Sequence, residues 1–301
     1  MEIGMVGLGR MGGGMAERLL RAGHRVVGYA PDDHKVQELA GKGGVGARSL
    51  DELVSNLSPR RTVWLMIPAG KPVEEVVLEL SELLDHGDVI IDGGNSHYRD
   101  TIRRSMMLEE SGIHLLDVGT SGGIWGLVDG YCMMVGGDQV FIEHVRPVLE
   151  TLAPGPDRGW GRVGPTGSGH FVKMIHNGIE YGMMQAYAEG FSILRAKEDL
   201  DLDLVSIAEV WRHGSVIRSW LLDLTARALE ENPDLQGVVP HVEDSGEGRW
   251  AVAEAIDLDV AAPVISLSLL QRLRSRDEEG FPDRIISSLR SQFGGHDIRR
   301  E

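Results

Sequence analysis

A glycine-rich turn near the start of the chain restricts the fold more than any other feature of the sequence. The turn reads Gly7-Leu8-Gly9-Arg10-Met11-Gly12, follows the apolar run Ile3–Val6 and precedes the helical pattern of Met11–Ala22. In this spacing the first glycine permits a tight turn, the second lets the backbone approach a pyrophosphate, and the third lets the helix pack closely on the strand. The helix N-terminus then faces the anion. We therefore expect all six residues to bind a dinucleotide, with a plain strand–turn–helix connection as the alternative.

The first half of the chain alternates short β-branched runs with segments of helical period. Buried strands are predicted over Ile3–Val6, Arg25–Tyr29, Thr62–Ile67, Val89–Asp92 and His114–Val118, and Tyr131–Gly137 resembles one more. Helices are predicted over Met11–Ala22, Pro72–Leu84 and Gln139–Leu152. This alternation predicts a parallel sheet with helices on both faces.

The sequence changes character between Pro154 and Pro165, where glycine and proline are frequent. No strand is predicted beyond this stretch. Thr166–Lys197 is typical of one long helix, and shorter helices follow it. We therefore expect an α/β Rossmann-like domain over residues 1–163 and an all-α domain for substrate binding and dimerisation over residues 164–301.

Composition excludes several classes of partner. The formal net charge is −16, whereas proteins that bind nucleic acids usually present a basic face. No apolar run approaches the ~20 residues that span a bilayer, so no membrane association is expected. The single cysteine, Cys132, excludes an internal disulfide and fits a cytoplasmic protein. Any binding site for a small anion must therefore be built locally, from a few cationic side chains or a helix N-terminus.

Asp32 stands at the end of the second predicted strand, 20 residues after Gly12. A carboxylate at this spacing is suited to the ribose hydroxyls of NAD and would repel the 2′-phosphate of NADP. The turn contains no arginine, which also favours NAD. The alternative is that Asp32 or Asp33 caps the next helix, and both roles are compatible.

A polar stripe on the long predicted helix is the strongest sign of catalysis. Lys173, His176, Asn177, Glu180 and Tyr181 stand at i, i+3, i+4, i+7 and i+8, so they share one helix face. Apolar residues flank the stripe, which indicates a helix buried on most sides. Burial lowers the pKa of a lysine and raises that of a carboxylic acid, as base and acid roles require. A solvated face without catalytic consequence is the alternative.

Three motifs resemble a known family, in the same order along the chain. Ile91–Ser96 reads IDGGNS, Val118–Gly123 reads VGTSGG, and Gly169–Gly182 reads GHFVKMIHNGIEYG. These motifs are similar to the signatures of 6-phosphogluconate dehydrogenases. The classical members are longer because their helical domain is duplicated, and this chain resembles the short, single-copy form.

The resemblance implies an NAD(P)-dependent, decarboxylating enzyme of pentose phosphate and gluconate metabolism. By this resemblance Lys173 is the general base at the 3-hydroxyl, and Glu180 protonates C1 after carbon dioxide leaves. The carboxylate and hydroxyls of the substrate would be held by Asn95, Ser121, Gly122, Gly123, His176 and Asn177. Asn95 would also contact the cofactor, which we expect to be NAD, with NADP possible. From the residues alone, the Ser121–Gly123 loop offers backbone N–H groups to an anion or is an ordinary glycine turn.

The resemblance also implies residues for the phosphate end of the substrate. Tyr181 and Arg218 would contact the phosphate, and Arg290 and His296 would reach into the site of a neighbouring subunit. We therefore expect a homodimer or homotetramer, although each of these residues taken alone also suits a plain surface position. One departure matters, because the family's Lys-Gly-Thr-Gly-Lys-Trp loop reads Ser245-Gly246-Glu247-Gly248-Arg249-Trp250 here. Either the phosphate is held mainly by Tyr181, Arg218 and a partner's Arg290, or the substrate differs.

Two other functions compete with this interpretation. A non-decarboxylating β-hydroxyacid dehydrogenase of the hydroxyisobutyrate type shares the fold and the lysine, but usually lacks the Asp92–Ser96 sequence and has Asn-Asn in place of His176-Asn177. A non-enzymatic NAD(P)-binding sensor has no need of a paired base and acid. The sequence favours the decarboxylating enzyme.

Overall fold

The computed structural model describes residues 1–294 and 297–299 and forms two compact units. The first unit comprises Met1–His176 and the second Asn177–Glu301, so the division falls within one long helix, α8 (Ser168–Ala196). The sequence predicted the boundary earlier, at residue 163. The first turns of α8 belong with the first unit because they pack against its sheet, where Gly169 lies close to strand backbone.

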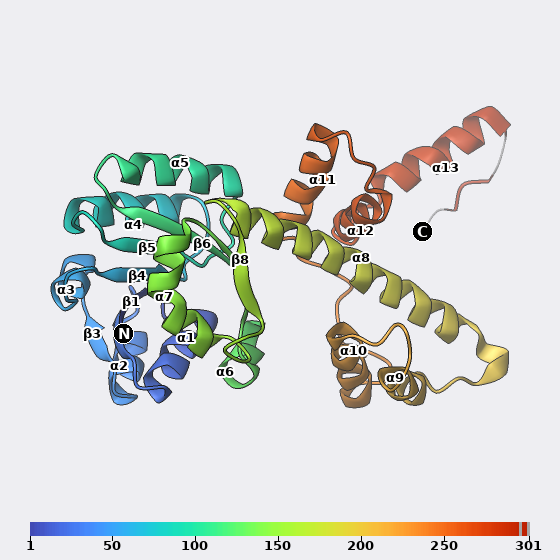
Figure 1. Ribbon diagram of the computed structural model, residues 1–301. Coiled ribbons are helices and arrows are strands. Elements are labelled where there is room, and N and C mark those ends of the chain that lie inside the picture. The colour runs from blue at the N-terminus through green and yellow to red at the C-terminus, as the bar shows by residue number, and fades with distance from the viewer. Residues whose placement is uncertain (295–296, 300–301) are drawn as a thin grey trace. The chain divides into compact units, whose positions relative to one another are not determined.

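The first unit is built on an eight-stranded sheet (Figure 1). Its strands are β1 (Glu2–Val6), β2 (Arg25–Tyr29), β3 (Val45–Ala47), β4 (Thr62–Leu65), β5 (Val89–Asp92), β6 (His114–Ser121), β7 (Cys132–Gly136) and β8 (Trp160–Gly164). Their order across the sheet is β3-β2-β1-β4-β5-β6-β7-β8. The strands predicted from sequence are all present, and the α/β class is confirmed.

The predicted parallel sheet is confirmed for β1 to β6 but not for the last two strands. β1 to β6 are parallel, whereas β7 runs antiparallel to β6, and β8 is parallel to β7. The reversal follows from the short connection between β6 and β7, residues 122–131, since parallel neighbours need a crossover of roughly a dozen residues or more. β8 was not predicted either, because it lies in the glycine- and proline-rich stretch and has no buried apolar run.

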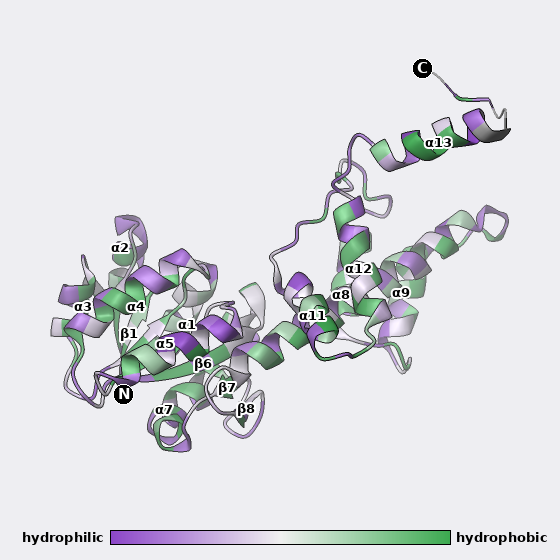
Figure 2. Cartoon of the chain, turned by 90° about the horizontal axis from the view of Figure 1, so that it is seen from above, coloured by the Kyte–Doolittle hydropathy of each residue, from purple (hydrophilic) through white to green (hydrophobic). Residues whose placement is uncertain are grey.

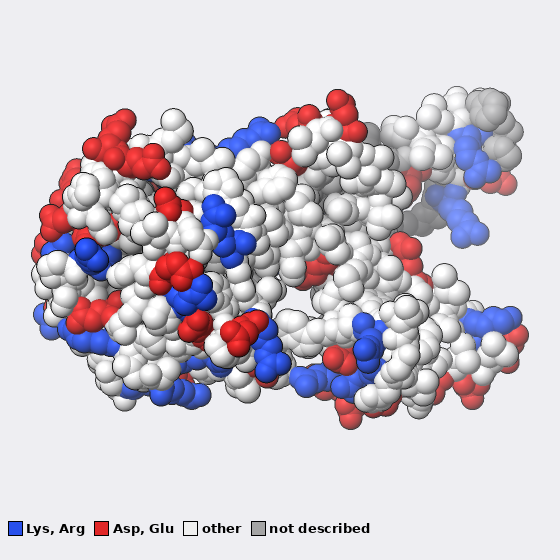
Figure 3. Space-filling view, in the orientation of Figure 1, with Lys and Arg blue, Asp and Glu red and all other residues white. Residues whose placement is uncertain are grey.

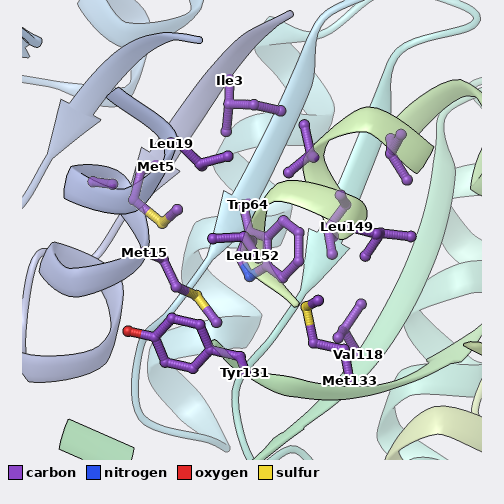
Figure 4. Packing of buried hydrophobic residues seen from close by; sticks show 14 of the residues in the cluster. Ile3, Met5, Met15, Leu19, Trp64, Val118, Tyr131, Met133, Leu149 and Leu152 are labelled. Atoms are coloured by element: carbon purple, nitrogen blue, oxygen red, sulfur yellow. The ribbon is translucent and has the colours of Figure 1, made fainter. Parts of the chain in front are cut away.

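Helices cover both faces of this sheet. They are α1 (Arg10–Arg21), α2 (Asp33–Gly41), α3 (Leu50–Ser55), α4 (Lys71–Leu83), α5 (Tyr98–Glu109), α6 (Gly126–Asp129) and α7 (Gln139–Leu152), with a short 3-10 helix at Gly123–Trp125. α1 and α7 pack on one face around Trp64 and Tyr131, which are fully buried with Met15 and Leu149 (Figure 4). α3, α4 and α5 enclose a second core on the opposite face. The sheet is therefore buried on both sides, as parallel sheets generally are.

The second unit is entirely helical within the described residues, in agreement with the sequence prediction. After α8 come α9 (Leu204–Arg212), α10 (Trp220–Glu231), α11 (Glu247–Asp257), α12 (Pro263–Arg274) and α13 (Phe281–Gly294), with a 3-10 helix at Glu198–Leu200. Its buried cluster is small and centres on Phe191 and Leu222. Figure 2 shows strongly hydrophobic segments on α13, where Ile286 and Leu289 are exposed. Among the described residues, no helix is long and apolar enough to cross a bilayer.

Candidate active site

Four parallel strands, β1, β4, β5 and β6, bring the predicted motifs to one edge of the sheet. Val6, Leu65 and Asp92 are aligned across β1, β4 and β5, and Asp92 is paired with Asp117 on β6. β6 then continues as far as Ser121. The glycine turn, the Asn95 turn and the Ser121 loop therefore all leave the carboxyl ends of neighbouring strands, where open α/β sheets bind their ligands.

The glycine turn has the conformation that the sequence predicts. Gly7 has φ +93°, and a Cβ there would lie 2.4 Å from the Met66 carbonyl oxygen. A Cβ on Gly12 would lie 2.0 Å from the Gly7 oxygen, so the start of α1 packs closely on the turn. Gly9 differs, because its Cβ would meet nothing within 4 Å. The protein itself does not require glycine at this position, and the space suits a ligand that approaches the backbone.

The N-terminus of α1 is available to such a ligand. Gly9 is the N-cap residue, and no side chain caps the helix. The first N–H groups of a helix have no partner within it and carry the positive end of the helix dipole. Of the other loop residues, Leu8 is buried and Arg10 is exposed. This arrangement fits the pyrophosphate of a dinucleotide.

Asp32 caps α2, which was the alternative that the sequence left open. Its Oδ1 accepts a hydrogen bond of 3.0 Å from the backbone N–H of His34, and the residue is exposed at the end of β2. Capping uses one carboxylate oxygen, so it is compatible with a contact to ribose hydroxyls.

Asn95 lies in a turn that is fixed by buried charge. Asp92 is 1% exposed, and it accepts hydrogen bonds from the Gly94 N–H at 3.1 Å and the Ser96 hydroxyl at 2.6 Å. Arg104 from α5 lies 3.9 Å from the same carboxylate. The turn between these contacts presents Asn95 as an exposed residue at the edge of the sheet.

The Ser121 loop is a turn that needs glycine. Gly122 has φ +134° and Gly123 has φ +52°, both in the region that glycine favours. The Gly122 carbonyl oxygen accepts from the N–H groups of Trp125 and Gly126. Gly123 is exposed, and no atom lies within 4 Å of its ideal Cβ. The local geometry therefore satisfies both sequence interpretations, a glycine turn and an accessible small-residue loop.

A buried carboxylate fixes the start of α8. Asp117 accepts hydrogen bonds from the N–H groups of Gly167, at 2.7 Å, and His170, at 2.8 Å. The His170 ring in turn lies 2.8 Å from the Thr101 hydroxyl through Nδ1. Burial raises the pKa of Asp117, although His170 and the two N–H groups oppose the shift. The anchor orients the helix three residues before Lys173.

Lys173 is packed directly onto β6. A Cβ on Gly119 would lie 2.3 Å from the Lys173 Cβ, so only glycine allows the approach. The lysine is 7% exposed, and its Nζ lies 3.4 Å from Nδ1 of His176. Asn177 is also buried, and Glu180 is half-buried. The helical stripe is therefore largely shielded from solvent, which disagrees with the alternative of a solvated face.

Tyr181 continues the stripe into the second unit and lies in a cluster of charged residues. The Arg272 guanidinium stands 3.4 Å above its ring, and its hydroxyl donates to Asp244 at 3.4 Å. Burial raises the pKa of the Tyr181 hydroxyl. A Cβ on Gly248 would lie 2.4 Å from the ring, so α11 approaches as closely as a glycine permits.

Arg272 and Arg276 were not predicted from the sequence as phosphate-binding residues. Their signal is the basic run Arg272-Leu273-Arg274-Ser275-Arg276, which ends α12 and is unusual in an acidic chain. Arg218, which was predicted for this role, lies before α10 and is exposed. Its contact with a phosphate remains a prediction.

Arg290 and His296 were predicted to reach into a neighbouring subunit, and the structure describes only the first of them. Arg290 lies on α13 and lines a hollow of about 390 Å³ with Asp283, Ile286, Ser287 and Asp297. His296 lies outside the described residues. In the described part of the chain, no group of three His, Cys, Asp or Glu side chains could hold a metal ion.

Comparisons with known proteins agree with this arrangement. Residues 2–162 match the profile of the NAD binding domain of 6-phosphogluconate dehydrogenase, and residues 169–283 match the profile of its C-terminal domain. An NAD(+)-dependent, decarboxylating 6-phosphogluconate dehydrogenase of Haloferax volcanii is 44% identical over 302 residues, covering 100% of this chain and 99% of that protein.

Two solved structures share the fold, and the 6-phosphogluconate dehydrogenase among them has the higher TM-score. The 6-phosphogluconate dehydrogenase of Plasmodium falciparum, solved with NADP+ and with 6-phosphogluconate, has a TM-score of 0.84 at 28% identity and covers 100% of this chain and 66% of that one. A 3-hydroxyisobutyrate dehydrogenase of Mycobacterium tuberculosis has a TM-score of 0.72 at 25% identity and covers 89% of this chain and 90% of that one. The matched profiles, the full-length relative and the geometry of the edge together show that the chain belongs to the 6-phosphogluconate dehydrogenase family.

Proposed function

We propose that the chain converts 6-phosphogluconate to ribulose 5-phosphate and carbon dioxide while reducing NAD or, less efficiently, NADP. The observation that carries the proposal is Lys173, a buried lysine packed on β6 and followed along one helix face by Glu180. The family membership and the uncapped glycine turn support the same reaction.

In this reaction Lys173 removes the proton of the 3-hydroxyl while hydride leaves C3. When bound, the nicotinamide ring supplies the chemistry of hydride acceptance. The product is a β-keto acid, in which the C3 carbonyl accepts the electrons of the C1–C2 bond as carbon dioxide leaves. Protonated Lys173 polarises that carbonyl. Glu180 then acts as the acid that protonates the former C2 carbon, which becomes C1 of the ketopentose phosphate.

The remaining residues of the proposed site orient the substrate. Asn95, Ser121, Gly122, Gly123, His176 and Asn177 are proposed to bind its carboxylate and hydroxyls. Tyr181 and Arg218 are proposed for the phosphate, and the position of Arg272 over the Tyr181 ring supports adding Arg272 to this group. Ser245 stands where the family has a phosphate-binding lysine. Arg272 can take over the role of that lysine, because guanidinium groups bind phosphate well.

The first test is nucleotide reduction with 6-phosphogluconate, with carbon dioxide measured in parallel. Replacing Lys173 with Met should reduce kcat by ~10²–10⁴-fold, the usual effect of losing a general base, while NAD binding stays close to that of the wild type. Lys197→Met is the matched control, because Lys197 is exposed at the end of α8. Near-normal turnover by Lys173→Met would remove the lysine from the mechanism. Nucleotide reduction without carbon dioxide would instead favour the hydroxyisobutyrate type of reaction.

Cofactor preference should follow Asp32. We expect kcat/KM to be higher with NAD than with NADP, because the Asp32 carboxylate would repel a 2′-phosphate. Replacing Pro31 and Asp32 by Arg and Thr should shift the ratio toward NADP, since threonine still caps α2 and the arginine pairs with the phosphate. A wild-type preference for NADP would show that Asp32 does not contact the ribose.

Assembly into a homodimer or homotetramer is part of the proposal. Supporting it, the helices of the second unit expose large apolar side chains, among them Ile193 on α8, Leu267 on α12 and Leu289 on α13. Homodimer interfaces are more apolar than the rest of a protein surface, so an interface with a second copy would bury such side chains. A cytoplasmic location is proposed as well, supported by the single cysteine, Cys132.

A further inference from the structure

A buried carboxylate lies among the cationic groups around Tyr181. The Asp244 side chain is 1% exposed, and it accepts hydrogen bonds from the Arg249 guanidinium, the Gly246 N–H at 3.1 Å and the Tyr181 hydroxyl at 3.4 Å. Arg276 lies 3.9 Å from the same carboxylate. Asp244 thus occupies donors that an anionic ligand of this cluster would use.

Arg272 lies on α12, and Arg276 follows the C-terminal end of that helix. The positions of these two side chains do not depend on the Asp244 carboxylate. Arg272 donates to the Glu243 carbonyl oxygen at 3.0 Å, and Arg276 donates to the Val242 carbonyl oxygen at 3.1 Å. Nη2 of Arg276 is buried and makes no hydrogen bond within the described structure. The carbonyl contacts hold both guanidinium groups in place, and Arg276 keeps donor capacity toward Asp244.

The loop carries two more carboxylates, and Oε2 of one of them, Glu243, also lies 3.9 Å from Nη2 of Arg276. The Glu247 carboxylate is buried and accepts from the Ser245 hydroxyl, and the Glu243 side chain is 85% exposed. Asp244 is the carboxylate to which the Tyr181 hydroxyl donates a hydrogen bond. A phosphate dianion bound at that hydroxyl would lie next to the Asp244 carboxylate, and the two negative charges would repel each other.

We propose that Asp244 is a built-in counter-anion, which neutralises the arginine cluster when no substrate is bound and competes with the substrate phosphate for it. This inference rests on the proposed function, because it takes the Tyr181 cluster as the phosphate end of the site. The competition lowers affinity for the phosphate end of the substrate and leaves the chemistry at Lys173 unchanged. The proposal also bears on Ser245, which stands where the family has a lysine. A lysine at that position would pair with Asp244 as well.

The test uses inorganic phosphate as the probe and the full-length chain. Asp244→Asn removes the charge and keeps an oxygen for the Gly246 N–H. We expect it to bind phosphate at least ~5-fold more tightly in calorimetry. Repulsion between two like charges about 4 Å apart weakens binding by about this factor even when both are well solvated. The KM for 6-phosphogluconate should fall in the same proportion, while kcat changes little. Glu230→Gln, an exposed site on α10 with the same change of charge, should leave both constants unchanged.

Two further variants complete the test. Adding Arg272→Gln to Asp244→Asn should abolish the gain, because the phosphate would lose the guanidinium that covers Tyr181. If Asp244→Asn does not fold, Asp244→Ser also keeps an oxygen for the Gly246 N–H and carries the same expectation. Unchanged or weaker phosphate binding, or a gain that survives Arg272→Gln, overturns the proposal. Phosphate binding is measured without turnover, so a wild type inactive on 6-phosphogluconate would overturn the proposed function and not the inference.

Discussion

At the scale of single residues, the close contact between Gly119 and Lys173 limits where the amine of the proposed general base lies. A methyl group on Gly119 would lie 2.3 Å from the Lys173 Cβ and 2.6 Å from the Gly169 carbonyl oxygen. Both atoms belong to the packed start of α8, so the helix must shift. We expect Gly119→Ala to lower kcat by ~10²-fold, the effect of displacing a reacting group by about 1 Å.

The control for this substitution is Gly161→Ala. Gly161 also lies on a strand, β8, but its ideal Cβ meets nothing within 4 Å. Its kcat should match that of the wild type. If Gly119→Ala keeps full activity at normal stability, the close approach of helix and strand does not position Lys173.

At the scale of secondary-structure elements, a charged contact joins α4 to α5 beside the Asn95 turn. Glu74 accepts from Arg103 at 2.6 and 2.8 Å and from Nε of Arg104 at 2.8 Å, and Arg104 reaches on toward Asp92. Hydrogen bonding from Arg103 has the largest effect on the pKa of Glu74, and hydrogen bonding from Arg104 and the positive charges of both arginines act in the same direction. Together they lower this pKa to about 2, although burial opposes the shift. The folded state therefore favours the ionised carboxylate.

The sign of the pH dependence follows from this shift. A carboxylate whose pKa is lower in the folded state stabilises the fold above its unfolded pKa of 4.5, and this contribution is lost as the pH falls from 4.5 toward 2. Glu74→Gln should reduce the free energy of unfolding by about 2 kcal/mol at pH 7, after allowance for solvent screening, and by much less near pH 2. Urea unfolding across this pH range measures the difference. Glu75→Gln, which removes an exposed neighbour, should cost less than ~0.5 kcal/mol, and an equal loss in both variants would contradict the argument.

At the scale of the whole molecule, the prediction concerns sites shared between subunits. If Arg290 completes the site of a neighbouring chain, inactive Lys173→Met and inactive Arg290→Ala chains should regain activity when their subunits exchange. Each hybrid dimer would contain one site with both residues intact, so an equal mixture should reach about a quarter of wild-type activity. Native mass spectrometry confirms the exchange. Exchange without activity, or an active monomer, would show that Arg290 acts within its own chain or not at all.

The acidic composition also belongs to this scale. Figure 3 shows acidic and basic side chains interleaved over the face in view, so the net charge of −16 does not exclude local cationic sites. The cluster around Asp244 is such a site, with Arg249, Arg272 and Arg276 gathered in one place. The sequence predicted that any anion site would be built locally, and the described structure contains a candidate.

Local sequence pattern was sufficient for much of the fold and for one side of the candidate site. The glycine turn, the buried strands of the first unit and the polar stripe of α8 each depend on residues that are neighbours in sequence. Their periods, two for strands and 3.6 for helices, place the side chains before any long-range contact forms. The order of the resembling motifs then indicated the family, which the comparisons confirmed.

Tertiary structure alone decided the features that join distant segments. Arg272 lies over Tyr181 although 91 residues separate them, and Asp117 caps a helix that begins 51 residues later. β8 forms only because β7 offers an edge, and β7 reverses because its connection to β6 is short. Such contacts are not encoded in any local period, since they depend on which surfaces remain to be buried once the elements have formed. For that reason the sequence indicated the helix that carries the proposed catalytic residues, and only the folded chain showed which charges surround Tyr181.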